Sequence, residues 1–362
     1  MNTKDLAEQN LIYKVRCGSH AYGTALSTSD VDYAGIFIPP IEYFFGLQAF
    51  DLLSEQTEED KSYYSLRKYA NLAVANNPNV LELLFVDEKD ICLSTPVASI
   101  LRSSRQLFLS QRCQKTFVGY AKAQLSRIRV HTKWLAQELH DMAILEPLYN
   151  KGKITKDWIA WRFGENMLKR LGVVDTSIYS RSGISNPDEN GVLELFKHSN
   201  IILPDKNDDR FHIIKEVGAE PDGRIIVRSF QKHLYDEAKK KRDQYVTWMA
   251  ERNPVRHETE LKFGYDTKHA MHLIRLLRMG YEILTEGELR VRRPDTTELL
   301  DIRAGKWSYE QVTEYADEMV AKIDNLGTSQ FKVPVIPDTN RINQMVIQIT
   351  RQYLEGYHGD KT

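Results

Sequence analysis

Two aspartates one residue apart constrain this chain more than any other feature. Asp30 and Asp32 stand in "GSHAYGTALSTSDVDYAGIFIPP", at the start of an apolar run that predicts a strand ending at Pro39-Pro40. Alternate side chains of a strand lie on one face, so both carboxylates are expected to point the same way and to raise each other's pKa. The pattern therefore predicts a cation beside them.

The Gly18-Ser19 pair stands where a first strand, residues 12–17, is expected to end. Glycine lets backbone N–H groups approach an anion, and the Ser19 hydroxyl can donate to a phosphate oxygen. An isolated Gly-Ser pair is usually a plain turn. Here a short helix in "HAYGTAL" separates it from the aspartates, so a triphosphate at Ser19 is expected to share Mg²⁺ or Mn²⁺ with Asp30 and Asp32.

This arrangement resembles the DNA polymerase beta superfamily of nucleotidyltransferases, and in particular its bacterial and phage RNA-repair-pathway branch. The resemblance implies an α/β (α+β) nucleotidyltransferase core with a mixed sheet, plus largely helical middle and C-terminal regions. It rests on the stretch quoted above and on "YYSLRKYANLAVANNPNVLELLF", "KTFVGYAKAQLSRIRVHTKWL" and "GYDTKHAMHLIRLLRMGYEILTEGELRVRRP".

The resemblance also implies a third carboxylate on a following strand. Asp60 opens a predicted strand at residues 60–66 and is our candidate to join Asp30 and Asp32 as a catalytic metal ligand. Glu58 and Glu59 are the alternatives. In the acidic run "EQTEEDK", any of these residues is equally compatible with a solvated charge.

A basic helical face is expected near the C-terminus. In "DTKHAMHLIRLL", Lys268, His272 and Arg275 share one face, and Asp266 is a candidate N-cap. The resemblance implies that this helix closes over the nucleotide cleft. Lys268 and Arg275 would then hold phosphates, and His272 would contact phosphate or acceptor. The alternative is an ordinary solvated face. Gly280 is the expected C-cap.

Three regions are predicted: a catalytic domain at residues 1–100, a mostly helical middle region at 101–253 with a loop-rich insertion at 180–209, and a helical domain at 254–362. A helix at 67–76 should follow the third strand. In the last region, "ELRVRRP" predicts a short basic strand. "SYEQ" predicts a capping box that opens a helix ending near residue 326.

Residues 91–137 contain no acidic residue. On a helical wheel, Phe117 and Ile128 belong to an apolar arc, and Tyr120 flanks that arc on the side away from the basic residues. The basic residues are candidates for RNA contact, with a solvated cationic face as the alternative. They are Lys115, Lys122, Arg129 and Lys133.

The formal net charge of −1 gives no global sign of nucleic-acid or membrane binding. Three scattered cysteines fit reduced thiols, and no apolar run reaches the length of a membrane span, so a cytoplasmic protein is expected. The sequence contains no P-loop, no dinucleotide-binding glycine fingerprint and no Cys/His zinc constellation, which disfavours kinases, dehydrogenases and deaminases.

The expected activity is transfer of a nucleoside monophosphate from an NTP, with ATP or CTP favoured, to an acceptor hydroxyl with release of pyrophosphate. The favoured acceptor is an RNA end, as in RNA repair or tailing. The alternatives are a small-molecule acceptor, a protein side chain, or a catalytically idle module that binds nucleotide or RNA. No feature of the sequence indicates a protein partner.

Overall fold

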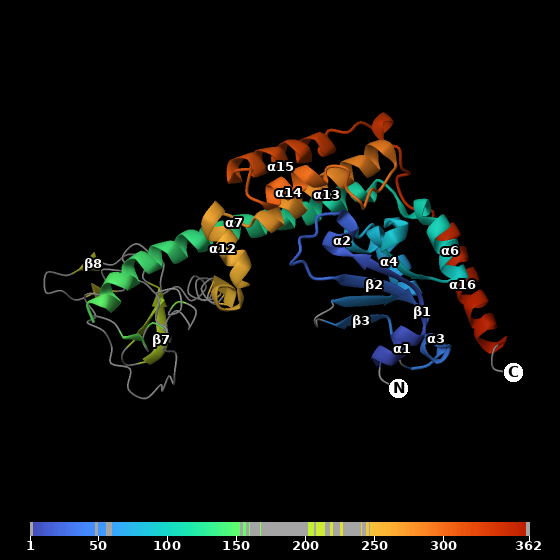
Figure 1. Ribbon diagram of the computed structural model, residues 1–362, viewed down its shortest axis with the longest axis horizontal. Coiled ribbons are helices and arrows are strands. Elements are labelled where there is room, and N and C mark those ends of the chain that lie inside the picture. The colour runs from blue at the N-terminus through green and yellow to red at the C-terminus, as the bar shows by residue number, and fades with distance from the viewer. Residues whose placement is uncertain are drawn as a thin grey trace. The chain divides into compact units, whose positions relative to one another are not determined.

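The computed structural model divides into two compact units, residues 1–129 with 266–362, and residues 130–265 (Figure 1). The candidate site lies wholly in the first unit. The described residues are 3–47, 50–55, 60–152, 155–156, 159, 167, 202–205, 208–213, 218–219, 225–226, 240, 244–245 and 247–359. The alternative ligands Glu58 and Glu59 therefore lie outside the described residues, as do residues 180–201 of the predicted loop-rich stretch.

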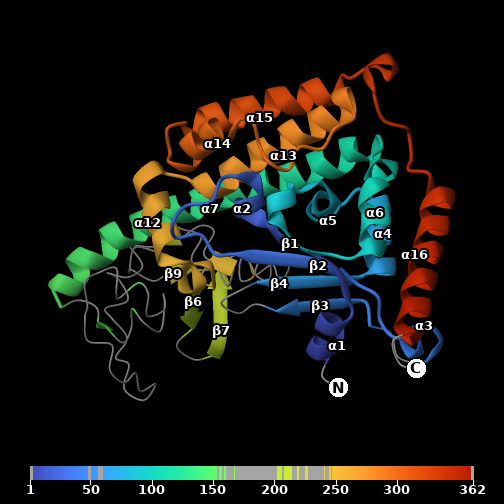
Figure 2. The same cartoon turned by 45° about the vertical axis from the view of Figure 1, so that its right-hand side comes forward.

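The first unit is built on a five-stranded mixed sheet with the order β3-β4-β2-β1-β5, which confirms the expected fold class (Figure 2). β2 pairs antiparallel with β1 and parallel with β4. The first three predicted strands are present. The strands are β1 (Leu11–Cys17), β2 (Asp32–Phe37), β3 (Leu52–Glu55), β4 (Lys61–Ser65) and β5 (Ile91–Ser94).

Short helices surround this sheet, and Tyr13, Val15 and Ile36 on one of its faces are fully buried. On the opposite face, Phe37 and Tyr63 pack in a small cluster with Ala7. The helices are α1 (Thr3–Gln9), α2 (Gly18–Tyr22), α3 (Glu42–Phe45), α4 (Leu66–Val74), α5 (Pro78–Leu81) and α6 (Pro96–Ser103), with 3-10 turns η1 (Glu82–Phe85), η2 (Glu88–Asp90) and η3 (Arg105–Phe108).

The long helix α7 (Arg112–Asn150) leads from the first unit into the second. Its predicted apolar arc is confirmed within the first unit, where Phe117 and Ile128 are fully buried. The C-terminal helices are α13 (Thr267–Glu286), α14 (Thr296–Arg303), α15 (Tyr309–Asp324) and α16 (Thr339–Gly359), with the 3-10 turn η4 (Thr328–Gln330) before α16.

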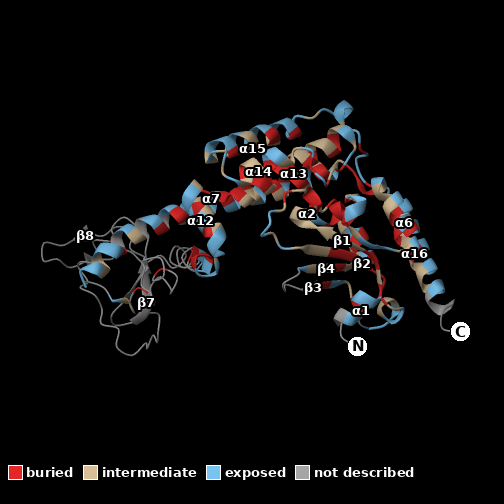
Figure 3. Ribbon diagram, in the orientation of Figure 1, coloured by how far each residue is buried: buried red, intermediate tan, exposed pale blue. Residues whose placement is uncertain are grey.

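α13 begins as predicted, because the Asp266 side chain accepts a hydrogen bond from the backbone N–H of His269. The expected end at Gly280 is wrong: the helix continues to Glu286 and is capped by Gly287 in the left-handed region. Gly280 has another purpose. A Cβ there would lie 2.9 Å from the Phe117 Cβ, so glycine lets α13 pack closely against α7. Figure 3 shows how much of α13 is buried.

The strand predicted from "ELRVRRP" is also wrong, because residues 288–294 form a loop. Ion pairs fix its side chains: Arg293, 4% exposed, binds Glu282 and Asp295. The backbone N–H of Arg293 donates to the carbonyl of Tyr22, which ties this loop to α2. The basic residues are thus held by carboxylates and by the end of α2.

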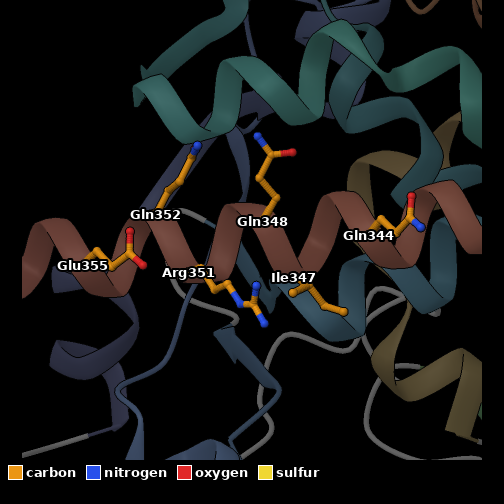
Figure 4. A pocket seen from close by; sticks show the side chains of 6 residues that line it. All are labelled: Gln344, Ile347, Gln348, Arg351, Gln352 and Glu355. Carbon is orange, nitrogen blue, oxygen red and sulfur yellow. The ribbon is translucent and has the colours of Figure 1, made fainter.

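The predicted capping box at Ser308 and Gln311 is confirmed and opens α15. α16 packs against α6 and α4. An open pocket on its surface is lined by residues of this one helix and by none of the predicted site residues (Figure 4). The lining residues are Gln344, Ile347, Gln348, Arg351, Gln352 and Glu355.

In the second unit, the end of α7 and α12 (Pro254–Phe263) carry a buried polar cluster. His257 Nε2 lies 3.1 Å from Glu138 Oε1, and Arg252 donates from Nε and Nη2 to the two carboxylate oxygens of Glu260. Burial acts to raise the pKa of Glu260, but hydrogen bonds with His131, His257 and Arg252 lower it to about 2. Two hairpins are also described: β6 (Ile202–Asp205) with β7 (Asp208–Ile213), and β8 (Gly218–Ala219) with β9 (Ile225–Ile226).

Among the described residues, none of the helices has the length and apolar character that crossing a bilayer requires.

Two glycine-to-alanine substitutions test the packing of α13. Alanine favours a helix over glycine by about 1 kcal/mol. At Gly280 this gain should be outweighed by the contact with Phe117, since overpacking a core typically costs about 1–3 kcal/mol. Gly280→Ala should therefore lower the urea midpoint of unfolding. Gly119→Ala is the matched control, because Gly119 lies on α7 with no atom within 4 Å of its Cβ position. It should raise the midpoint. A raised midpoint for both would contradict the tight α7–α13 contact.

Candidate active site at the start of strand β2

The Gly-Ser pair forms the first turn of α2, directly after β1. The predicted helix thus begins earlier than expected and includes Gly18 and Ser19. Gly18 has φ +62°, which an L side chain rarely adopts, and a Cβ on it would lie 2.2 Å from the Asp32 Oδ2. Glycine is therefore required here twice, for the backbone conformation and for the close approach of the carboxylate. Ser19 is partly exposed beside it.

Strand pairing brings Asp60 to Asp32. Tyr33 pairs with Lys61 in the parallel β2–β4 ladder, and the Tyr33 N–H donates to the Asp60 carbonyl oxygen at 2.8 Å. Asp32 and Asp60, one residue before this pair on each strand, therefore lie side by side on one sheet face. Strand β2 begins at Asp32, so Asp30 lies in the loop before it and not in the strand as predicted.

The charges around Asp32 show that the predicted carboxylates converge. Partial burial raises the pKa of Asp32 above its usual range, and Asp60 raises it further. Lys268 opposes this shift, Asp30 adds to it, and His20 opposes it more weakly. Residues from α2, β2, the start of β4 and α13 thus interact at one carboxylate. His20 is not among the predicted site residues, although it directly follows Ser19.

These residues fit a divalent cation. Asp30, Asp32 and Asp60 offer hard carboxylate oxygens, and the repulsion that raises the Asp32 pKa is what a bound cation would relieve. Asp30 and Asp60 are exposed, so the site is accessible to solvent. Lys268 is a single monovalent charge against three carboxylates.

The predicted basic face of α13 is divided by the structure. Lys268 and His272 are partly exposed, and Lys268 interacts with Asp32. Arg275 is 3% exposed and lies away from solvent. It pairs with Glu82 at 2.7 Å, and its guanidinium carbon lies 3.6 Å from the centroid of the Tyr22 ring. This position assigns Arg275 to anchoring α13, in place of the phosphate contact that we predicted.

Glu82 and Tyr22 complete this anchor, and neither was predicted as a site residue. The Tyr22 hydroxyl donates to the second carboxylate oxygen of Glu82, and both residues are buried. Arg292 donates to the carbonyl of His20, so a second cation holds α2 from the same side. A signal for Glu82 was present, since it is an acidic residue inside the apolar run "NVLELLF".

Cys17 pairs with Asp32 in the β1–β2 ladder and lies on the same sheet face. Burial raises the pKa of its thiol to about 12, and Asp32, Glu82 and Asp60 add to the shift. The neutral thiol is thus the stable form beside the carboxylates, which disfavours its use as a nucleophile.

The predicted basic stripe on α7 is exposed. Lys115 and Lys122 lie in the first unit and have no carboxylate partner within ion-pair distance among the described residues. Arg129 is different, because its guanidinium lies 3.9 Å from Asp317 on α15. Residues 91–137 contain no acidic residue, but the fold brings a carboxylate from α15 near Arg129. Lys133, on the part of α7 that belongs to the second unit, is exposed.

The raised pKa of Asp32 predicts how the stability of the metal-free protein depends on pH. Folded Asp32 binds its proton more tightly than unfolded Asp32, so its ionised form destabilises the fold at neutral pH. Asp32→Asn should therefore raise the unfolding midpoint at pH 7 in EDTA. The difference from the parent should shrink as the pH falls through the raised pKa towards the ordinary value. Added Mg²⁺ should stabilise only the parent. A difference that is independent of pH would contradict the convergence of the three carboxylates.

Comparison with known proteins agrees with this geometry. Residues 2–140 match the model of the RNA repair pathway DNA polymerase beta family. An uncharacterised 38.9 kDa protein of Enterobacteria phage T4 is 24% identical over 336 residues, 89% of this chain and 90% of the phage protein. The uncharacterised YcgL of Bacillus subtilis is 35% identical over 80 residues, 21% of this chain and 31% of that protein.

No solved structure gives a significant match. The resemblance found in the sequence is nevertheless confirmed. Residues 2–140, which carry the Gly-Ser turn and all three aspartates, match the RNA repair pathway DNA polymerase beta family.

Proposed function

We propose that this chain is a divalent-metal-dependent nucleotidyltransferase. It would transfer a nucleoside monophosphate from an NTP to an acceptor hydroxyl and release pyrophosphate. The single observation that carries the proposal is the convergence at Asp32, whose carboxylate lies against Gly18 and interacts with Asp60, Asp30 and Lys268. The family match over the same residues agrees with a polymerase beta-like nucleotidyltransferase.

Each residue has a role in this proposal. Backbone N–H groups of the Gly18 turn and the Ser19 hydroxyl bind the triphosphate, and Lys268 neutralises phosphate charge. His272 lies one turn further along α13 and contacts phosphate or acceptor. Asp30, Asp32 and Asp60 hold the cation. When bound, a divalent cation lowers the energy of charge that develops on the phosphate oxygens.

The bond changes follow from an in-line displacement. The acceptor oxygen forms a bond to the α-phosphorus, and the bond from that phosphorus to the α–β bridging oxygen breaks. Pyrophosphate leaves with the electron pair. The proton of the acceptor hydroxyl passes to the exposed carboxylate of Asp60, which directly precedes β4. ATP or CTP is the nucleotide we favour, and an RNA end is the acceptor we favour.

The activity is tested with each labelled NTP, Mg²⁺ or Mn²⁺, and a pool of RNA. The parent should transfer label and release pyrophosphate. Asp30→Asn and Asp32→Asn should lose transfer by at least about 100-fold, because catalysis of phosphoryl transfer is mostly positioning and charge stabilisation. Both variants should keep the parent's fold by circular dichroism. Retained transfer in either variant would reject the site. A nucleotide-dependent rise in melting temperature without transfer would indicate a binding module instead.

The acceptor is tested on α7. Lys115 and Lys122 are the residues to change, because Arg129 already faces Asp317. The double variant Lys115→Glu, Lys122→Glu should bind RNA more weakly, and log affinity should fall less steeply with log salt concentration, because fewer counterions are released. NTP binding should not change.

The control for this test is Lys306→Glu, Lys332→Glu, which makes the same change of net charge at exposed lysines of the same unit. An equal loss of affinity in both double variants would show a non-specific charge effect. Parent-like RNA binding by the Lys115 and Lys122 variant would favour a small-molecule or protein acceptor.

A further inference from the structure

The sheet face that carries Asp32 and Asp60 continues beyond them onto β4 and the edge strand β3. Ser62 and Tyr64 follow Asp60 at two-residue intervals, so they lie on its face. In the antiparallel β3–β4 ladder, Ser62 pairs with Ser54 and Tyr64 pairs with Leu52. Directly paired residues share a face. A hydroxyl pair near the carboxylates is thus followed by an aromatic–aliphatic pair further along the strands.

This group, which we call the β3–β4 shelf (Leu52, Ser54, Ser62 and Tyr64), is accessible. Leu52 is 46% exposed, Ser54 is exposed, and Ser62 and Tyr64 are partly exposed. Burial raises the pKa of Tyr64, and the neighbouring Ser62 side chain opposes this shift. An exposed leucine beside a tyrosine on a sheet edge leaves apolar area in water, which burial under a flat ligand would remove.

A second tyrosine, Tyr120 on α7, lies near Tyr64. Burial raises the pKa of Tyr64, and Tyr120 adds to the shift. The Asn77 side-chain amide donates to the Tyr120 hydroxyl at 2.8 Å. That hydrogen bond fixes the position of Tyr120 while its side chain stays partly exposed. On the helical wheel, Tyr120 lies on the side of α7 away from the basic stripe.

The order of the strands assigns a side to the acceptor. The Gly18 turn follows β1, Asp32 begins β2, and Asp60 precedes β4. Because β2 lies between β1 and β4 in the sheet, the three sites follow one another in this order, and the edge strand β3 lies beyond β4 (Figure 2). An in-line displacement needs attacking and leaving oxygens on opposite sides of the phosphorus. If pyrophosphate leaves on the β1 side, the hydroxyl must attack from the β4–β3 side, where the shelf lies.

We propose that the β3–β4 shelf is the acceptor subsite and holds the terminal nucleoside of a single-stranded nucleic acid. Ser62 and Ser54 hydrogen-bond the ribose, next to the carboxylates where the reacting hydroxyl must lie. The terminal base stacks on Tyr64 and Leu52, with Tyr120 beside it. Stacking accepts any base, so the subsite selects a nucleotide end without strong base preference. This inference rests on the proposed function, because the direction of attack comes from it.

The test measures stacking of the terminal base on the protein in the absence of nucleotide transfer. A ten-nucleotide RNA with 2-aminopurine at its 3′ end is titrated with the protein and Mg²⁺ in the absence of NTP, and fluorescence quenching is measured. The parent should quench the probe. Tyr64→Leu should lose most of the quenching and weaken binding about tenfold, as expected when one stacked base is lost. Tyr64→Phe should keep both.

Two more variants make the result specific. Tyr33→Leu is the matched control, because Tyr33 is a partly exposed tyrosine of the neighbouring strand that points to the opposite face, over Lys14. It should quench like the parent. Ser54→Glu changes an exposed residue of an edge strand, so the fold should survive. The added carboxylate should repel the RNA and lower the quenching.

The outcomes separate this inference from the proposed function. Quenching that persists in both Tyr64→Leu and Ser54→Glu, or that is absent in the parent, overturns the shelf. Transfer of label to RNA by a protein with unchanged quenching in those variants would leave the proposed function intact and reject the shelf alone. Quenching that depends on Tyr64, in a protein that transfers no nucleotide, would support the shelf as a binding site for a nucleotide end and reject the enzymatic proposal.

Discussion

The buried ion pair between Arg275 and Glu82 is the contact on which the candidate site depends. It joins α13 to η1, and the Tyr22 hydroxyl and ring bring α2 to the same point. α13 also carries Lys268, and α2 carries Gly18 and Ser19. Removing one member of a buried ion pair costs about 3–5 kcal/mol, since the other charge is left uncompensated. The helix α2, which carries Gly18 and Ser19, and the helix α13, which carries Lys268, are therefore held by one buried contact.

Around this anchor, the site is arranged as a charge imbalance. Three carboxylates lie near one lysine and one histidine, while the other arginines of the neighbourhood are committed to carboxylates or carbonyls. Arg293 binds Glu282 and Asp295, and Arg292 binds the carbonyl of His20. The basic residues that might have neutralised Asp30, Asp32 and Asp60 thus hold the backbone instead. Lys268 and His20 are thus the cations that act on Asp32, against the carboxylates of Asp30 and Asp60.

The sequence predicted those parts of the fold and site that depend on local spacing. Gly18, Ser19, Asp30 and Asp32 stand within one short stretch, so their proximity needs only a strand, a turn and a strand. The nearness of Asp60 to Asp32 comes from a parallel pairing, which composition and periodicity do not specify. The family resemblance supplied it.

Contacts between residues far apart in the sequence explain why some of the predictions were wrong. Gly280 was predicted to be a C-cap, but it is required for the close packing of α13 against α7. A glycine required for helix packing cannot be distinguished from a helix-ending glycine by sequence alone. "ELRVRRP" alternates like a strand, but ion pairs of Arg293 decide its conformation. Arg275 lies on a polar helical face in sequence, and only a partner 193 residues away shows that this face is partly buried.

That separation has a consequence for synthesis on the ribosome. Residues 130–265 interrupt the unit that holds the candidate site, so the first half of that unit emerges long before the second. At about 5–20 residues per second, Glu82 waits roughly 10–40 s for Arg275. Until then the nascent sheet carries a carboxylate in an apolar setting and lacks Lys268. The candidate site therefore cannot be completed on the ribosome until α13 has been translated.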